Sequence, residues 1–177
     1  RKTGSITGFR QIDEAGGFQQ TDLIIVAAES SQGKTSFAIG AANEQANHGM
    51  PIAFYSIEMT AEQIVSRMLA PTSHIPSNVI LNRPMTESQF ANYDAAMHKV
   101  EGLPIYFDEN STMSTDGIIA SIRTMVIKHG IKGAYVDYLQ LLRDNERGKT
   151  EEQIIASSAR RFKNLAKELN IFIVLLS

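Results

Sequence analysis

Short apolar segments alternate with longer amphipathic segments along the whole chain. The short segments are rich in β-branched residues and largely apolar, without the strict apolar–polar alternation of a half-exposed strand. Five such segments cover residues 23–28, 52–57, 103–107, 134–142 and 171–176. Uniformly apolar strands are typical of parallel sheets that helices cover on both faces. The pattern therefore predicts an α/β fold with a mainly parallel β-sheet and helices on both of its faces.

The segments between these strands carry the start signals and the periodicity of helices. Three of them begin with a capping box, in which a threonine and a glutamine three residues later satisfy N–H groups of the first turn. The boxes are Thr60/Gln63, Thr86/Gln89 and Thr150/Gln153. Elsewhere, Ile118, Ile122, Met125 and Val126 recur on one helical face. Strands that alternate with helices indicate crossover connections, and ligands of such sheets bind beyond the carboxyl ends of the strands.

Composition narrows the class of protein. The 177 residues are 43% hydrophobic and 20% charged, and 17 Lys and Arg nearly balance 19 Asp and Glu. At roughly 150 residues per domain, we expect one domain over residues 1–177. No apolar segment reaches the ~20 residues of a membrane helix, and the near-neutral charge excludes a protein that binds polyanions by bulk charge alone. The lack of cysteine excludes disulfides and thiolate metal sites, and it fits a reducing cytoplasm.

The two ends of the sequence favour a piece of a longer polypeptide. The chain begins with Arg1 rather than Met, and it stops directly behind the apolar segment 171–176, where an α/β protein normally continues. We therefore expect an α/β domain that is truncated at its C-terminal end.

A candidate phosphate-binding loop follows the first strand. Residues 29–35 read ESSQGKT and precede a segment expected to be helical over 36–47. In the pattern G-x-x-x-x-G-K-[ST], backbone N–H groups point at phosphate oxygens, the lysine reaches the β- and γ-phosphates, and the hydroxyl binds Mg²⁺. Ala28 stands at the first glycine position and G-K-T also occurs by chance, but the strand before it and the helix after it favour a nucleotide site. The predicted nucleotide-binding residues are Ser30, Ser31, Gln32, Gly33, Lys34, Thr35 and Ser36, and Lys34 also has a catalytic role.

A second G-K-T, at residues 148–150, serves as an internal comparison. Acidic residues surround it, and Glu151 and Glu152 occupy the place where phosphate would bind. Their field repels an anion. Thr150 is also the predicted N-cap of the following helix, so its hydroxyl is committed to the backbone. We exclude this second copy as a phosphate site.

Two carboxylates are candidates to complete the site. Glu58 stands at the end of the second strand, and Asp137 lies inside the fourth apolar segment. A buried acid is costly unless a cation or hydrogen bonds compensate it, and Mg²⁺ held by Thr35 would do so. Asp137 then holds the ion or its waters, and Glu58 is the candidate base that orients and deprotonates the attacking water. The simpler alternatives are a helix-start acid for Glu58 and a strand-end surface acid for Asp137.

Several segments together resemble one known family. The second strand ends in SIEM at residues 56–59, residues 136–141 read VDYLQL, and LAKELN precedes the last apolar segment. With the glycine-containing opening of the chain, these segments resemble, in order and over nearly all residues, the C-terminal domain of the DnaB family of replicative helicases. Ala28 also agrees with that family. Glu29 and Ser30 differ from its usual Arg-Pro, and Gln20 and Thr21 from its usual Pro-Gly.

This resemblance implies a RecA-like P-loop NTPase fold and a homohexameric ring that hydrolyses ATP with Mg²⁺ at subunit interfaces. Hydrolysis would drive 5′→3′ movement on single-stranded DNA and unwind duplex. In the family a Gln sensor, a channel loop and an arginine finger follow the last strand seen here, so we expect the chain alone to be weakly active or inactive.

Family loops at the ligand edge line the central channel, which makes Arg143, Arg147 and Lys149 candidate DNA contacts, with a solvated loop as the simpler interpretation. Primase and a helicase loader are candidate partners, and the expected location is the cytoplasm, at a bacterial nucleoid or in a phage-infected cell, without a membrane.

Two other functions stay open at this point. The chain could belong to a RecA-like ATPase of recombination or repair, or to a helicase-derived assembly module that binds nucleotide without turnover. Arg67, Arg160 and Lys163 match family positions. A solvent-exposed helix face is the simplest interpretation of Arg160 and Lys163, and Arg67 receives no role.

Overall fold

The computed structural model describes residues 4–27, 31–56, 59–82, 84–108, 114–137 and 148–177. Five parallel strands form one sheet in the order β1-β5-β4-β2-β3. Their bounds are β1 Leu23–Val26, β2 Ile52–Tyr55, β3 Ile105–Asp108, β4 Gly133–Asp137 and β5 Phe172–Leu176. Each of the five apolar segments therefore overlaps one strand, and the predicted parallel sheet is confirmed.

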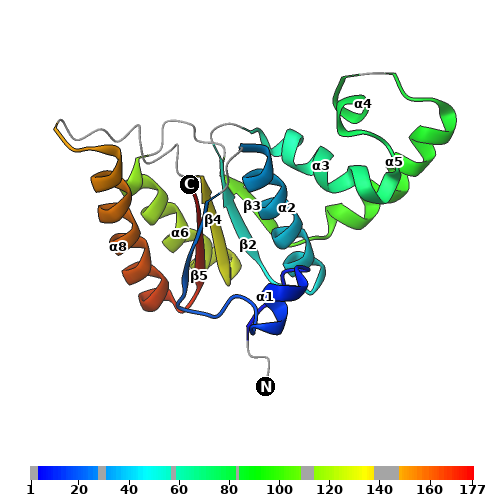
Figure 1. Cartoon of the computed structure of the whole chain (residues 1–177). Helices are drawn as coiled ribbons and strands as arrows, with labels where there is room; N and C mark the ends of the chain where they lie inside the picture. Colours follow the sequence, from blue (N-terminus) through cyan, green and yellow to red (C-terminus); the bar gives the residue numbers. More distant parts are fainter. Residues whose placement is uncertain (1–3, 28–30, 57–58, 83, 109–113, 138–147) are drawn as a thin grey trace.

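Helices cover both faces of this sheet, as the apolar pattern predicts (Figure 1). Helix α2 packs on one face, where its apolar residues join those of β2, β4 and β5 in one core cluster, while α6 and α8 pack on the other face and form a second cluster. Helices α3, α4 and α5 extend beyond the β3 edge (Figure 1). The helix bounds are α1 Arg10–Glu14, α2 Ser31–Asn47, α3 Ala61–Ser73, α4 Ser77–Asn82, α5 Glu87–Glu101, α6 Thr115–His129 and α8 Glu151–Leu169.

The three predicted capping boxes are all present. Thr60, Thr86 and Thr150 each accept a hydrogen bond from the backbone N–H three residues later, and the glutamine at that position binds back to the cap. The boxes start α3, α5 and α8, so local sequence alone sets these three boundaries. None of the described helices combines the length and the apolar character needed to cross a membrane.

Burial along the strands follows their place in the sheet. The central strands β2, β4 and β5 are buried at every position, whereas the edge strands β1 and β3 are only partly buried. Ile25 of β1 is 51% exposed. The apolar pattern does not distinguish edge strands from central ones, because it reports the faces of a strand and not its unpaired backbone edge.

The turn into β1 contains a threonine in an unusual conformation. Thr21 has φ 75, in the left-handed region that β-branched residues rarely adopt. Two hydrogen bonds hold it there, from its own N–H to the Ile171 carbonyl (2.9 Å) and from Lys163 Nζ to its carbonyl (2.7 Å). The ammonium of Lys163 thus fixes this turn, and the interpretation of Lys163 as part of a solvent-exposed helix face is wrong.

Candidate active site

The carboxyl edge of the sheet brings together the predicted site residues that the structure describes. All five strands run parallel, so their carboxyl ends lie at the same edge. Helix α2 begins at this edge shortly after β1 ends, and the strand β5 lies between β1 and β4. The start of α2 therefore faces the end of β4 across one strand, which is the usual position of a ligand site in such folds.

Helix α2 begins earlier than the sequence predicts. The expected boundary was residue 36, but the helix already contains Ser31, Gln32, Gly33, Lys34 and Thr35. The phosphate-loop pattern predicted a loop through Thr35, but in the structure these residues form the first turns of the helix. The first turn of a helix directs its backbone N–H groups out of its end and carries partial positive charge. The predicted anion-binding segment thus lies at a helix N-terminus.

Lys34 and Asp137 meet inside the protein. Lys34 Nζ lies 3.7 Å from Asp137 Oδ1, and the two residues are only 5% and 4% exposed. The interpretation of Asp137 as a strand-end surface acid is therefore wrong. A buried carboxylate needs a compensating charge, and the ammonium of Lys34 supplies one. The first turn of α2 and the last residue of β4 are the elements that bring this pair together.

Apart from Lys149, the other predicted residues fall into three groups. Thr35 is half-buried beside Lys34, and Gly33 and Ser36 are exposed at the start of α2. For Ser31 and Gln32 the structure describes the main chain only. The remaining predicted positions lie outside the described residues; they are Ser30, Glu58, Arg143 and Arg147.

The residues that flank Glu58 lie at the same edge as Asp137. In the register of the sheet Tyr55, the last residue of β2, pairs with Val136, so the chain leaves β2 beside Asp137. Beyond the undescribed residues, the N–H of Met59 donates to Ser56 Oγ (3.3 Å). This hydrogen bond joins the described residues on either side of residues 57 and 58, and Glu58 itself lies outside the described residues.

The second G-K-T has the geometry expected from the sequence. Gly148 has φ 98 and Lys149 is exposed. The Thr150 hydroxyl accepts a hydrogen bond from the Gln153 N–H (3.3 Å) as the cap of α8. Its hydroxyl is thus used by the backbone, and the exclusion of this copy as a phosphate site is consistent with the structure.

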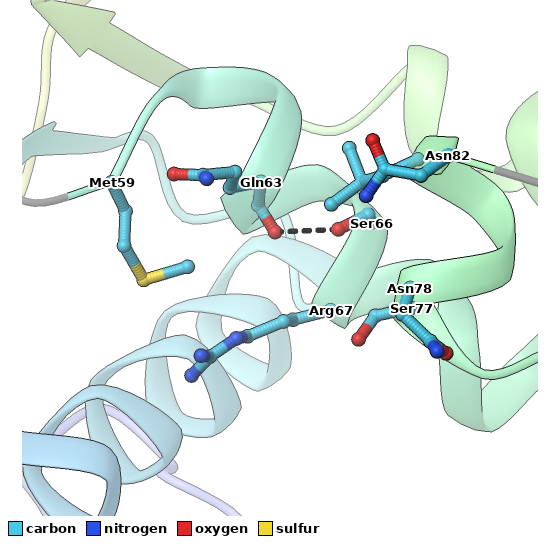
Figure 2. A pocket seen from close by; sticks show the side chains of 8 residues that line it. Met59, Gln63, Ser66, Arg67, Ser77, Asn78 and Asn82 are labelled. Atoms are coloured by element: carbon cyan, nitrogen blue, oxygen red, sulfur yellow. Dashed lines mark hydrogen bonds between the residues drawn. The ribbon is translucent and has the colours of Figure 1, made fainter.

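A polar cavity adjoins the connection that carries Glu58. Its volume is about 350 Å³, and it lies between α3 and α4. Figure 2 shows Arg67 extending from α3 toward the neighbouring α2, where it also lines a second cavity of about 270 Å³. The residues that line the first cavity are Met59, Gln63, Ser66, Arg67, Ser77, Asn78, Leu81 and Asn82. No sequence pattern marks this cavity, because α3 and α4 create it only by packing together.

Helix α8 carries two arginines next to each other. Arg161 forms an ion pair with Asp116 of α6, while Arg160 is exposed. A second ion pair joins Arg123 of α6 to Glu168 (2.8 Å). Hydrogen bonding from Arg123 lowers the pKa of Glu168. The two ion pairs therefore connect α6 and α8, which pack on the same face, and this gives their four members a structural role.

The sheet is parallel, a lysine lies in the first turn of the helix after β1, and an aspartate ends a strand one position away in the sheet. This arrangement is that of the RecA-like P-loop fold class. The sequence matches the family described as DnaB-like helicase C terminal domain over residues 4–177, and the chain belongs to that family. Both the fold class and the family inferred from the sequence are thereby confirmed.

Curated relatives include replicative DNA helicases of bacteria. The chain is 35% identical to "Replicative DNA helicase DnaC" of Bacillus subtilis and 34% identical to "Replicative DNA helicase DnaB" of Geobacillus stearothermophilus, in both cases over 99% of this chain and 39% of the relative. A third, "Replicative DNA helicase DnaB" of Synechocystis, is 34% identical over 98% of this chain and 20% of the relative. The chain thus spans well under half the length of these relatives.

Solved structures share the fold. "ATPase Domain of G40P" aligns with a TM-score of 0.89 at 24% identity, covering 100% of this chain and 64% of that one. "The Structure Of A DnaB-Like Replicative Helicase And Its Interactions With Primase" aligns with a TM-score of 0.87 at 24% identity, covering 100% of this chain and 43% of that one.

Proposed function

We propose that this chain forms the ATP-hydrolysing motor of a replicative DNA helicase. The observation that carries the proposal is the buried pair of Lys34 and Asp137, 3.7 Å apart at the carboxyl edge of the sheet. Family membership supports the same activity, since the curated relatives are replicative helicases. Burial of a lysine and a carboxylate carries a large desolvation penalty. Binding of a nucleotide and a metal ion would give both side chains a function.

The start of α2 is suited to bind a triphosphate. In this proposal the main chain of Ser30, Ser31, Gln32 and Gly33 donates N–H groups to phosphate oxygens, and Ser36 completes the turn. Lys34 binds the β- and γ-phosphates and neutralises the charge that develops during hydrolysis.

Thr35 and Asp137 are suited to hold Mg²⁺. A hydroxyl and a carboxylate are the hard oxygen donors that this ion prefers, and Mg²⁺ needs only one or two protein ligands when phosphates supply others. Among the described residues no cluster of three or more His, Asp or Glu side chains forms an all-protein metal site, which is consistent with an ion held jointly with nucleotide. When bound, Mg²⁺ would neutralise phosphate charge.

Glu58 is the proposed base. Glu58 follows the end of β2 by three residues, and the pairing of Tyr55 with Val136, the neighbour of Asp137, supports this role. Its carboxylate would orient the attacking water and accept its proton.

The curated relatives support a wider activity. We propose that six copies form a ring around single-stranded DNA and move 5′→3′ along it, with Arg143, Arg147 and Lys149 contacting phosphates in the channel. Primase and a helicase loader are the proposed protein partners, and the cytoplasm is the proposed location. A solved relative is described with its interactions with primase, which supports the first of these partners.

An unwinding assay tests this function. We expect the intact protein, given ATP and Mg²⁺, to separate a duplex that carries a 5′ single-stranded tail, because the loaded strand is the one along which the ring moves. The same duplex with a 3′ tail is the matched control and should remain paired. Pairing of complementary strands instead of separation would point to a recombination ATPase. Nucleotide binding without hydrolysis or unwinding would point to an assembly module, and either result would contradict the proposal.

A further inference from the structure

One stripe of α2 faces the sheet and carries a polar residue at each end. Lys34, Ala38, Ala41 and Gln45 are four, three and four residues apart, so they lie on the same side of the helix. Both alanines are fully buried, and Gln45 is 1% exposed. The helix therefore contacts the sheet through small apolar side chains between two buried polar ones.

Strand β4 supplies a partner for each polar end. Tyr135 and Asp137 are two residues apart on this strand, so their side chains project from the same face. Asp137 pairs with Lys34, and the Tyr135 hydroxyl donates a 2.6 Å hydrogen bond to Gln45 Oε1. The single strand β4 is thus joined to α2 near both ends of the helix.

The amide of Gln45 is itself held in one orientation. Its Nε2 donates to Ser5 Oγ (3.1 Å), and Ser5 Oγ donates to the Phe18 carbonyl (3.2 Å). Burial raises the pKa of the Tyr135 phenol, so its hydroxyl keeps its proton and remains a donor. The carbonyl and amino groups of Gln45 therefore both have defined partners.

The two kinds of contact on this stripe constrain the helix differently. Packing of alanine methyl groups is non-directional and fixes the axial position of a helix only weakly. A hydrogen bond requires a defined distance and angle, and an unmade one is costly in the interior. Sliding of α2 along β4 would break the bond between Tyr135 and Gln45 before it lost much apolar contact.

We infer that the Gln45–Tyr135 pair is a positioning device for the nucleotide site. It fixes the axial position of α2 on β4 and thereby sets where Lys34 and Thr35 lie relative to Asp137. This inference rests on the proposed function, because it assigns the pair to the same site. Neither residue touches nucleotide; both act through α2.

A second buried tyrosine provides a matched control. Tyr55 of β2 is 1% exposed, and its hydroxyl is hydrogen-bonded to Ser121 Oγ (2.9 Å) of α6 on the opposite face of the sheet. Tyr55→Phe and Tyr135→Phe each remove one buried hydroxyl and one hydrogen bond, but only Tyr135→Phe removes a contact to α2. A purely structural role predicts that the two variants behave alike.

The test measures the affinity of the intact protein for a fluorescent, non-hydrolysable ATP analogue in the presence of Mg²⁺. We expect Tyr135→Phe to raise the Kd about fivefold, the equilibrium equivalent of one lost hydrogen bond, and Tyr55→Phe to change it less than about twofold. Hydrogen exchange should become faster in the first turns of α2 in Tyr135→Phe but not in Tyr55→Phe. Gln45→Met should weaken binding similarly, and the double variant Gln45→Met with Tyr135→Phe should lose little more than either alone, because both changes break the same bond.

Each outcome separates this inference from the proposed function. Equal affinities of Tyr135→Phe, Tyr55→Phe and the unchanged protein would overturn the positioning role while leaving the nucleotide site intact. Equal losses in both tyrosine variants would also overturn it, because they would indicate general loosening. Failure of the unchanged protein to bind the analogue would instead contradict the proposed function. If Tyr135→Phe does not fold, the same test uses Gln45→Met. Its affinity for the analogue and the hydrogen exchange of its helix α2 are then compared with those of the unchanged protein.

Discussion

Lys34→Ala is expected to weaken binding of the Mg²⁺–ATP complex at least about 100-fold and to abolish its hydrolysis. The ammonium of Lys34 is buried at the start of α2, where the surrounding protein screens its charge far less than water would. Its loss removes the charge that the proposal places against the β- and γ-phosphates. It also leaves the buried carboxylate of Asp137 without the ammonium 3.7 Å away, so a negative charge would face the triphosphate. Titration with a fluorescent ATP analogue and a phosphate-release assay measure the two effects.

The control for this prediction lies at the other end of β4. Lys132 is exposed and directly precedes the strand that ends in Asp137, so Lys132→Ala removes the same charge far from the carboxyl edge. It should bind and hydrolyse ATP as the unchanged protein does. Equal affinities of Lys34→Ala and Lys132→Ala would contradict the assignment of Lys34 to the phosphates.

Glu58→Gln is expected to retain nucleotide binding and to lose hydrolysis by about 10²- to 10⁴-fold. The amide keeps the size of the side chain and can still hold a water molecule, but it cannot accept a proton. Kd should therefore stay near that of the unchanged protein while kcat falls, and DNA unwinding should fall with kcat. Equilibrium titration and single-turnover hydrolysis separate these quantities.

Glu62 is the matched acid for this experiment. It is exposed in the first turn of α3, four residues after Glu58, and Glu62→Gln should hydrolyse ATP normally. If Glu58→Gln kept full hydrolysis, Glu58 would be the helix-start acid that the sequence allows as an alternative. A loss of nucleotide binding in Glu58→Gln would equally argue against its role as the base.

Signals that are local in sequence predicted the fold well. Uniformly apolar strands identified the parallel sheet, and the capping boxes at Thr60, Thr86 and Thr150 located three helix starts, because a cap involves only residues three apart. The predicted start of α2 was too late, because the phosphate-loop pattern predicts a loop through Thr35 whereas the helix already begins at Ser31.

The sequence predicted those site residues whose burial is energetically unfavourable without a compensating partner. An acid inside an apolar strand needs a cation, which led to Asp137, and the structure places it beside Lys34. Contacts between distant segments carried no such signal. Tyr135 and Gln45 are 90 residues apart, and Lys163 and Thr21 are 142 apart. Each residue of these pairs has an ordinary place in its own helix, strand or turn, so only the fold reveals the pairing.

The central claim is that a triphosphate binds between the first turn of α2 and the end of β4. A crystal structure of the protein with Mg²⁺ and a non-hydrolysable ATP analogue tests it most directly. The account predicts a terminal phosphate oxygen in contact with Lys34 Nζ, and a metal ion about 2.1 Å from the Thr35 hydroxyl on the side of Asp137. An analogue bound elsewhere on the molecule, or bound with its phosphates away from Lys34, would contradict it.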